Sequence, residues 1–265
     1  MATRPILYVL VGRHGGPQFS PTVFKTMLCL YHKGVEFDVK ELVWTELRAK
    51  REPWKTDRPT LPTIELPGGE IVMDSNKIAD WLESQRPDAP SLYLPDKPTS
   101  QCDTGAVSAI KAYLNYVSTT FGSPAPAGVK FSPFFAGICN GILGLIEAEE
   151  DRAYFTSDTK LMVQDGWKQL QAVDRDASIR QSKGFVVSLE GFLKSTPFFH
   201  GAAPGIIDYT IWGRYAFSRV ADPEATRTIW TSSDTPNVVA WIDKLESKFA
   251  SQLKEQKDRW PEAGK

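Results

Sequence analysis

Two short stretches of the chain combine residue types that can bind and stabilise charged groups. Ser20 is followed directly by Pro21, a pair typical of the N-cap and first residue of a helix. A hydroxyl donor at the positive end of a helix can stabilise an anion. Asp74 and Ser75 form a second such pair, because a carboxylate attracts an ammonium group and a hydroxyl at a helix N-terminus receives a carboxylate.

The sequence around these pairs predicts the elements that would position them. A continuous apolar run indicates a buried first strand, and Gly34 indicates the end of the helix that begins at Ser20. The predicted elements are a strand at 6–11, a helix at 20–33, a strand at 35–43, a hairpin at 63–66 and 70–73, and a helix beginning at Asp74-Ser75. The order is βαβ followed by ββα, which is a thioredoxin-like arrangement with two parallel strands and an antiparallel hairpin.

The remainder of the chain is predicted to be helical. Residues 86–104 contain four prolines and indicate a linker. Helical patterns follow at 106–120, 134–154, 161–173, 185–193, 206–220 and 238–253. We therefore predict an α/β thioredoxin-like domain over residues 1–95, a linker over 96–104, and an all-α domain over 105–265.

Composition and charge exclude several classes of function. The formal net charge is −1, and no basic block points to nucleic acid or to an anionic membrane surface. The three cysteines form no CxxC pair and the three histidines have no metal-ligand spacing, so we expect no disulfide framework and no metal. We find no stretch typical of a signal peptide or a membrane span, and we expect a cytoplasmic protein.

The stretch 59–83, with Pro62 before its first strand and Asp74-Ser75 after its second, resembles the glutathione-binding half of the glutathione transferase family. The resemblance implies a cis bond at Pro62, which turns the backbone of Leu61 towards the cysteinyl part of glutathione. It also implies that Asp74 and Ser75 hold the γ-glutamyl end. The alternative is that Asp74-Ser75 only caps a helix and that Pro62 only begins a strand.

The same resemblance, to the serine-type classes of the family, implies that Ser20 is the catalytic residue. A free thiol has a pKa of about 8.5, so little thiolate is present at neutral pH. Lowering this pKa by about two units requires roughly 2.7 kcal/mol, the order that one charge-assisted hydrogen bond and a helix terminus supply. Position 20 is not Cys, which argues against thioltransferase chemistry. The alternative is that Ser20 is only a helix cap.

Within the family, the N-terminal half looks most like the fungal etherase-related transferases, whose relatives include bacterial β-etherases. The resemblance implies a hydrophobic aromatic, phenolic second substrate. Six aromatic residues of the helical domain are candidates for its pocket, although aromatic residues at helical spacing also form cores. They are Tyr113, Tyr116, Phe121, Phe131, Phe134 and Phe135.

Two functions remain open. One is a detoxifying transferase that uses glutathione as co-substrate, and the other is a ligandin-type binding protein that sequesters aromatic compounds with little turnover. The resemblance also implies a homodimer. The charged segment 44–58 would supply the cation for the glycyl carboxylate of glutathione, from Lys50, Arg51, Lys55 or Arg58, and its length suggests an interface or a lid.

One position departs from the family pattern. Family members carry Ser or Thr three residues before an Asp at the start of a late helix, whereas here Gly205 precedes Asp208. We therefore expect the helix to lack one reciprocal capping bond, at a cost of a few tenths to about 1 kcal/mol.

Overall fold

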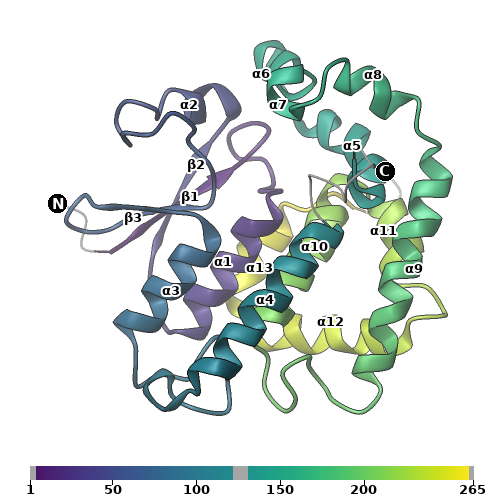
Figure 1. Ribbon diagram of the computed structural model, residues 1–265. Coiled ribbons are helices and arrows are strands. Elements are labelled where there is room, and N and C mark those ends of the chain that lie inside the picture. The colour runs from purple at the N-terminus through teal and green to yellow at the C-terminus, as the bar shows by residue number, and fades with distance from the viewer. Residues whose placement is uncertain (1–3, 122–130, 263–265) are drawn as a thin grey trace.

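The structure is a computed structural model that describes residues 4–121 and 131–262, without the side chains of 117–121. The sheet and helices α1 to α3 occupy one side of the molecule, and the later helices occupy the other (Figure 1). The elements of the first part are β1 (Ile6–Leu10), α1 (Pro21–His32), β2 (Asp38–Leu42), α2 (Trp44–Arg48), β3 (Thr63–Glu65), β4 (Ile71–Met73) and α3 (Ser75–Gln85).

The four strands form one mixed sheet in the order β2-β1-β3-β4. β1 pairs in parallel with β2 and antiparallel with β3, and β3 pairs antiparallel with β4. This arrangement confirms the predicted thioredoxin-like order. β2 is shorter than predicted because the N–H of Val35 donates to Leu30 O (3.0 Å) and that of Val43 donates to Glu46 Oε2 (3.1 Å). Those groups are therefore not available to the sheet.

The second part is helical, as predicted. Its elements are a 3₁₀ helix (Thr99–Gln101), α4 (Thr104–Phe121), α5 (Pro133–Leu145), α6 (Glu149–Phe155), α7 (Asp158–Leu161), α8 (Gly166–Gln171), α9 (Arg175–Leu193), α10 (Ile206–Ala221), α11 (Pro223–Trp230), α12 (Pro236–Lys248) and α13 (Ala250–Asp258). Within the described ranges, every helix is too short or too polar to cross a membrane.

The predicted helix over 134–154 is two helices, and the interruption joins the two parts of the molecule. The N–H of Glu147 donates to the carbonyl of Gly12, at 3.0 Å, instead of continuing the helical ladder. Gly12 lies two residues after Leu10, the last residue of β1. The break between α5 and α6 therefore fixes the helical part against the carboxyl end of β1, an inner strand of the sheet.

α1 and α10 pack side by side in the middle of the molecule (Figure 1). The approach is close at Gly213, where an added Cβ would lie 2.3 Å from the carbonyl oxygen of Pro21. Phe24 of α1 meets the ring of Trp212 edge to face, with centroids 5.8 Å apart. Because α1 begins at Pro21, this contact holds the start of α1, and with it Ser20, in place.

The N-terminus of α10 has an additional acceptor that the sequence did not predict. Asp208 accepts from the N–H of Gly205 (3.0 Å), and the N–H of Ile207 donates to Nε2 of His200 (3.2 Å). A Cβ at position 205 would lie 2.6 Å from the His200 ring. Gly205 has no side chain, so the reciprocal bond from residue 205 is missing, as expected. The structure adds that His200 supplies an acceptor to the neighbouring N–H of Ile207 and occupies the space that a larger residue than Gly would need.

Candidate active site

Ser20 is held in the extended conformation directly before α1. Its hydroxyl oxygen accepts from the N–H of Val23 (3.4 Å), so it is an N-cap, as the sequence predicts. Its backbone is fixed by the buried side chain of Gln18, which accepts from the N–H of Ser20 and donates to its carbonyl (3.2 Å). Local hydrogen bonds therefore determine where the hydroxyl lies.

A second hydroxyl connects Ser20 to the turn before β3. Thr22 Oγ1 lies 3.1 Å from Ser20 Oγ and donates to the carbonyl of Leu61 at 3.4 Å. The bond between Leu61 and Pro62 is cis, the geometry that the family resemblance implies. Sequence reasoning did not single out Thr22, because nothing in its local sequence distinguishes it from any other residue in the first turn of a helix.

Asp74 and Ser75 lie at the N-terminus of α3. Asp74 is the N-cap, with φ at 89°, and its carboxylate accepts from the N–H of Asn76 (2.8 Å) and of Lys77 (3.2 Å). The hydroxyl of Ser75 accepts from Nζ of Lys25 at 3.4 Å, which ties α1 to α3. The predicted cap is confirmed, and the carboxylate and hydroxyl lie together at one helix terminus.

Two cations lie next to Ser75, and sequence reasoning gave neither a role. Lys25 of α1 is buried, and Arg214 of α10 is partly buried. Burial lowers the pKa of Lys25 and lowers that of Arg214 to about 10. Both line a cavity of about 30 Å³ with Ser75 and Asn76, and within the described residues neither makes an ion pair. An anion held beside Ser75 would lie close to two cations that have no ion-pair partner among the described residues.

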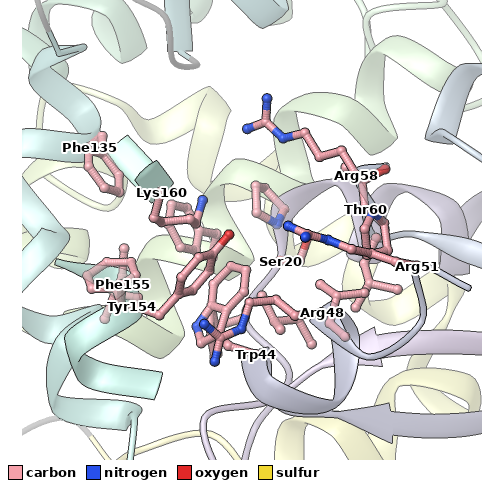
Figure 2. Close-up of a pocket in the computed structure, with 18 residues that line it drawn as sticks. Ser20, Trp44, Arg48, Arg51, Arg58, Thr60, Phe135, Tyr154, Phe155 and Lys160 are labelled. Atoms are coloured by element: carbon pink, nitrogen blue, oxygen red, sulfur yellow. The ribbon is translucent and has the colours of Figure 1, made fainter. Parts of the chain in front are cut away.

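A larger cavity of about 280 Å³ lies between the two parts of the molecule, and Ser20 lies in its wall. Pro21 lines both this cavity and the small one beside Ser75. Figure 2 shows Tyr154, Phe155 and Lys160 on one side of Ser20, and Arg51, Arg58 and Thr60 on the other. The lining is Leu10, Phe19, Ser20, Pro21, Trp44, Leu47, Arg48, Arg51, Arg58, Pro59, Thr60, Leu61, Phe135, Ile142, Tyr154, Phe155, Lys160 and Phe217.

The cavity uses different aromatic residues from most of those proposed above. Of the six candidates, Phe135 lines it. Phe131 and Phe134 are buried in the packing of the helical part, where Phe134 contacts Trp230 edge to face with centroids 6.2 Å apart. The rings of Tyr113 and Tyr116, both on α4, have centroids 6.2 Å apart. Neither residue is among the described residues that line the cavity. The side chain of Phe121 lies outside the described residues.

The other aromatic residues that line the cavity come from short helices, whose sequences contain no strong local pattern that predicts a helix. Trp44 begins α2, and Tyr154 and Phe155 end α6. The rings of Trp44 and Tyr154 have centroids 5.8 Å apart with 56° between their planes, so they form an aromatic wall that spans both parts of the molecule. Figure 2 shows the hydroxyl of Tyr154 directed towards the middle of the cavity.

The structure narrows the choice among the four basic residues of the 44–58 segment. Arg51 and Arg58 line the cavity. Lys50 instead lies against the rings of Tyr8 and Trp54, with Nζ 5.7 and 5.9 Å from their centroids. Lys55 is exposed and is not in the lining of the described cavities. No group of three or more potential metal ligands occurs among the described residues.

Comparisons with known proteins agree with this architecture. Residues 19–85 match the family model described as "Glutathione S-transferase, N-terminal domain". No curated protein sequence matches the chain. Among solved structures, a glutathione S-transferase of Ceriporiopsis subvermispora in complex with glutathione is similar over 95% of this chain and 100% of its own, with a TM-score of 0.65 and 15% identity.

Two further structures show the same likeness. A glutathione transferase from Phanerochaete chrysosporium is 17% identical, with a TM-score of 0.64 over 97% of this chain and 98% of its own. A Tau class glutathione S-transferase from mango is 15% identical, with a TM-score of 0.61 over 99% of this chain and 94% of its own. At such identities the likeness establishes the fold. The chain therefore has the fold of these glutathione transferase structures, and residues 19–85 match the model of the family's N-terminal domain.

Proposed function

We propose that this protein is a glutathione transferase in which Ser20 stabilises the glutathione thiolate for attack on a hydrophobic aromatic electrophile. One observation carries the proposal: Ser20 and Leu61 line the same cavity as the aromatic wall of Trp44 and Tyr154. A thiol bound at the backbone of Leu61 would thus lie near both a hydroxyl donor and a site for a flat substrate.

The hydrogen bonds of Ser20 suit it to this role. Its oxygen accepts from the N–H of Val23 and can also accept from the hydroxyl of Thr22, 3.1 Å away. The hydrogen of Ser20 can therefore be donated to a thiolate, and the positive end of α1 adds to the stabilisation. In the reaction, a bond forms between sulfur and an electrophilic carbon while the bond from that carbon to an aryloxide oxygen breaks. The aryloxide then takes a proton from water.

The described residues also offer partners for both ends of glutathione. Asp74 and Ser75 suit the ammonium and carboxylate of the γ-glutamyl end, and Lys25 and Arg214 add positive charge beside Ser75. For the glycyl carboxylate, Arg51 and Arg58 remain from the four basic candidates, because these two line the cavity. The related Ceriporiopsis structure contains glutathione, which supports the same co-substrate here.

The second substrate that we propose is an aryl ether or a related phenolic compound, as expected for the etherase-related class. The aromatic rings of Trp44, Tyr154, Phe155 and Phe135 support a flat ligand. The same rings would equally serve a ligandin-type protein that sequesters such compounds, so turnover decides between the two functions. The cytoplasmic location and the homodimer stay predictions, and sedimentation velocity on the purified protein tests the homodimer.

The proposal is tested by the Ser20→Ala variant, assayed with glutathione and a panel of electrophiles that includes a β-aryl ether. We expect the variant to bind glutathione and to lose about 10²-fold in rate, the usual scale for one donor to a developing anion. Wild type that binds glutathione and phenols without turnover would establish the ligandin function instead. Failure of wild type to bind glutathione would exclude both functions.

A matched control separates catalysis from capping. Ser132 is also followed by proline, begins α5 and accepts from the N–H of Phe135 at 3.2 Å. Ser132→Ala therefore removes the same type of N-cap bond, worth about 1 kcal/mol, without touching Ser20. We expect the control to lose stability and keep its rate. Equal rate losses in the two variants would mean that Ser20 is only a cap.

A further inference from the structure

The cavity beside Ser20 contains more positive charge than glutathione requires. Four cationic side chains line it, and no acidic residue lies in its lining among the described residues. Arg48 is neutralised by Glu150, at 2.7 Å. The other three cations, Arg51, Arg58 and Lys160, make no ion pair within residues 4–121 and 131–262.

Lys160 differs from the other cations in its position. It lies on α7, in the helical part of the molecule, and its backbone N–H donates to the capping hydroxyl of Ser157 at 3.2 Å. Its Nζ lies 4.9 Å from the centroid of the Trp44 ring. Figure 2 shows it beside Tyr154 and Phe155, across the cavity from Arg51 and Arg58. Lys160 therefore lies beside the aromatic wall and on the helical part of the molecule, unlike Arg51 and Arg58.

The surroundings of Lys160 disfavour its charge. Burial and, to a smaller extent, the nearby charge of Arg58 lower the pKa of Lys160. Arg58 itself contacts a weak acceptor, the sulfur of Met162, at 3.3 Å from Nη1. Arg58 is exposed, so the free-energy cost falls mainly on Lys160, and an anion bound beside Lys160 would offset that cost.

The glycyl carboxylate of glutathione would account for one of the three cations, and it comes from the side of Arg51 and Arg58. Lys160 is then left with an aromatic surface next to it. We propose that the cavity binds an aromatic carboxylate, with its ring against Trp44 and Tyr154 and its carboxylate held by Lys160. The inference names the substrate class of the proposed transferase site and rests on that proposal. The cavity volume, about 280 Å³, fits one such small ligand.

The test compares two ligands of equal shape and different charge. Naphthalene-2-carboxylate and its neutral amide are titrated into the full-length protein by isothermal titration calorimetry, with saturating glutathione present. We expect wild type to bind the carboxylate at least tenfold more tightly than the amide. Lys160→Met, which keeps the apolar stem against Trp44, should lose this preference and retain its affinity for the amide within about threefold. Lys160→Arg should keep the preference.

Two controls make the outcomes distinguishable. Lys168→Met, at an exposed position on neighbouring α8, should bind both ligands as wild type does. Glutathione affinity is measured separately for each protein. Wild type that binds glutathione but does not prefer the carboxylate overturns this inference and leaves the transferase proposal intact. Wild type that prefers the carboxylate but binds no glutathione overturns the transferase proposal and leaves the carboxylate site standing. A Lys160→Met variant that loses affinity for glutathione, and not for naphthalene-2-carboxylate, also overturns the inference of a carboxylate site.

Discussion

At the scale of single residues, the chemistry proposed here depends on a pair of hydroxyl groups. Ser20 Oγ and Thr22 Oγ1 are 3.1 Å apart, and Thr22 also donates to Leu61. Either hydroxyl can donate across this contact. When Thr22 turns its hydrogen from the carbonyl of Leu61 to Ser20 Oγ, it leaves the hydrogen of Ser20 to a ligand and holds the oxygen of Ser20 in place. In the proposed reaction, Thr22 is thus a positioning residue for Ser20.

This arrangement predicts the effect of Thr22→Val, which removes the hydroxyl and keeps the shape of the side chain. We expect kcat/KM to fall by roughly tenfold, about 1.4 kcal/mol, less than for Ser20→Ala. The pKa of bound glutathione, followed by thiolate absorbance, should rise. Thr228→Val, at an exposed position on α11, is the control and should change neither quantity. An unchanged thiol pKa in Thr22→Val would show that Thr22 does not act through Ser20.

Residue roles were predictable where the signal is local. Ser20 and Asp74 follow from cap chemistry, which depends on three or four consecutive residues. Arg214 and Lys160 were not predictable, because each reaches its cavity through the packing of a helix that is distant along the chain. No composition or spacing rule places a basic residue on the inner rather than the outer face of such a helix.

At the scale of elements, the N-terminus of α10 depends on a histidine being neutral. Nε2 of His200 accepts from the N–H of Ile207 and can do so only without a proton. Burial, followed by the nearby His32, lowers the pKa of His200 to about 4. The folded state therefore binds this proton less readily than the unfolded chain, in which the pKa is about 6.5.

The consequence is a loss of stability in mild acid. The contribution of His200 is complete above about pH 6.5 and is lost as pH falls towards 4, because the unfolded state then binds more protons. We expect the free energy of unfolding in urea to fall by about 2 kcal/mol from this residue between pH 7 and pH 5. His200→Gln keeps an acceptor that does not titrate, so its loss over this interval should be smaller. An equal loss in both proteins would contradict the role of His200.

Element boundaries differ from the predictions where a backbone group leaves its ladder for a tertiary partner. β2 is shortened by bonds from Val35 and Val43, and the predicted helix 134–154 is interrupted where Glu147 donates to Gly12. In each case the hydrophobic pattern continues through the interruption, and periodicity alone gives no sign of it. The existence and order of the elements were predictable, and the boundaries were not.

At the scale of the whole molecule, the contact between α1 and α10 joins the two parts and carries the site. An added Cβ at Gly213 would lie 2.3 Å from the carbonyl of Pro21, the first residue of α1. Any separation of the two helices at this point would move the backbone next to Ser20. The stability of the molecule and the geometry of its site are therefore coupled at one glycine.

The coupling predicts that Gly213→Ala lowers both properties together. We expect a loss of at least about 2 kcal/mol in the free energy of unfolding, because backbone atoms must move to accept the methyl group, and a fall in kcat. Gly184→Ala is the matched control, since Gly184 lies in α9 with no atom within 4 Å of an added Cβ. It should stabilise the protein by up to about 1 kcal/mol through helix propensity. A Gly213→Ala variant with wild-type stability and rate would exclude the coupling.

The fold class was predictable from the sequence, because hydrophobic periodicity and turn residues indicate the type and order of the helices and strands. The lining of the cavity was not. The aromatic residues of 131–135 have the same pattern whether they face a cavity or a core, and the structure buries Phe131 and Phe134 while Phe135 lines the cavity. Which face of a helix is available to a ligand is decided by its neighbours.

The division of the cavity between two parts of the chain has an evolutionary consequence. Ser20, Thr22 and Leu61, which would handle the thiol, belong to the sheet-containing part, whereas Tyr154 and Lys160, which would select the aromatic partner, belong to short helices of the other. Mutations in α6 and α7 can therefore exchange one aromatic partner for another while the thiol chemistry is inherited unchanged. Descendants of one ancestral gene can in this way diversify their substrates without first losing their activity.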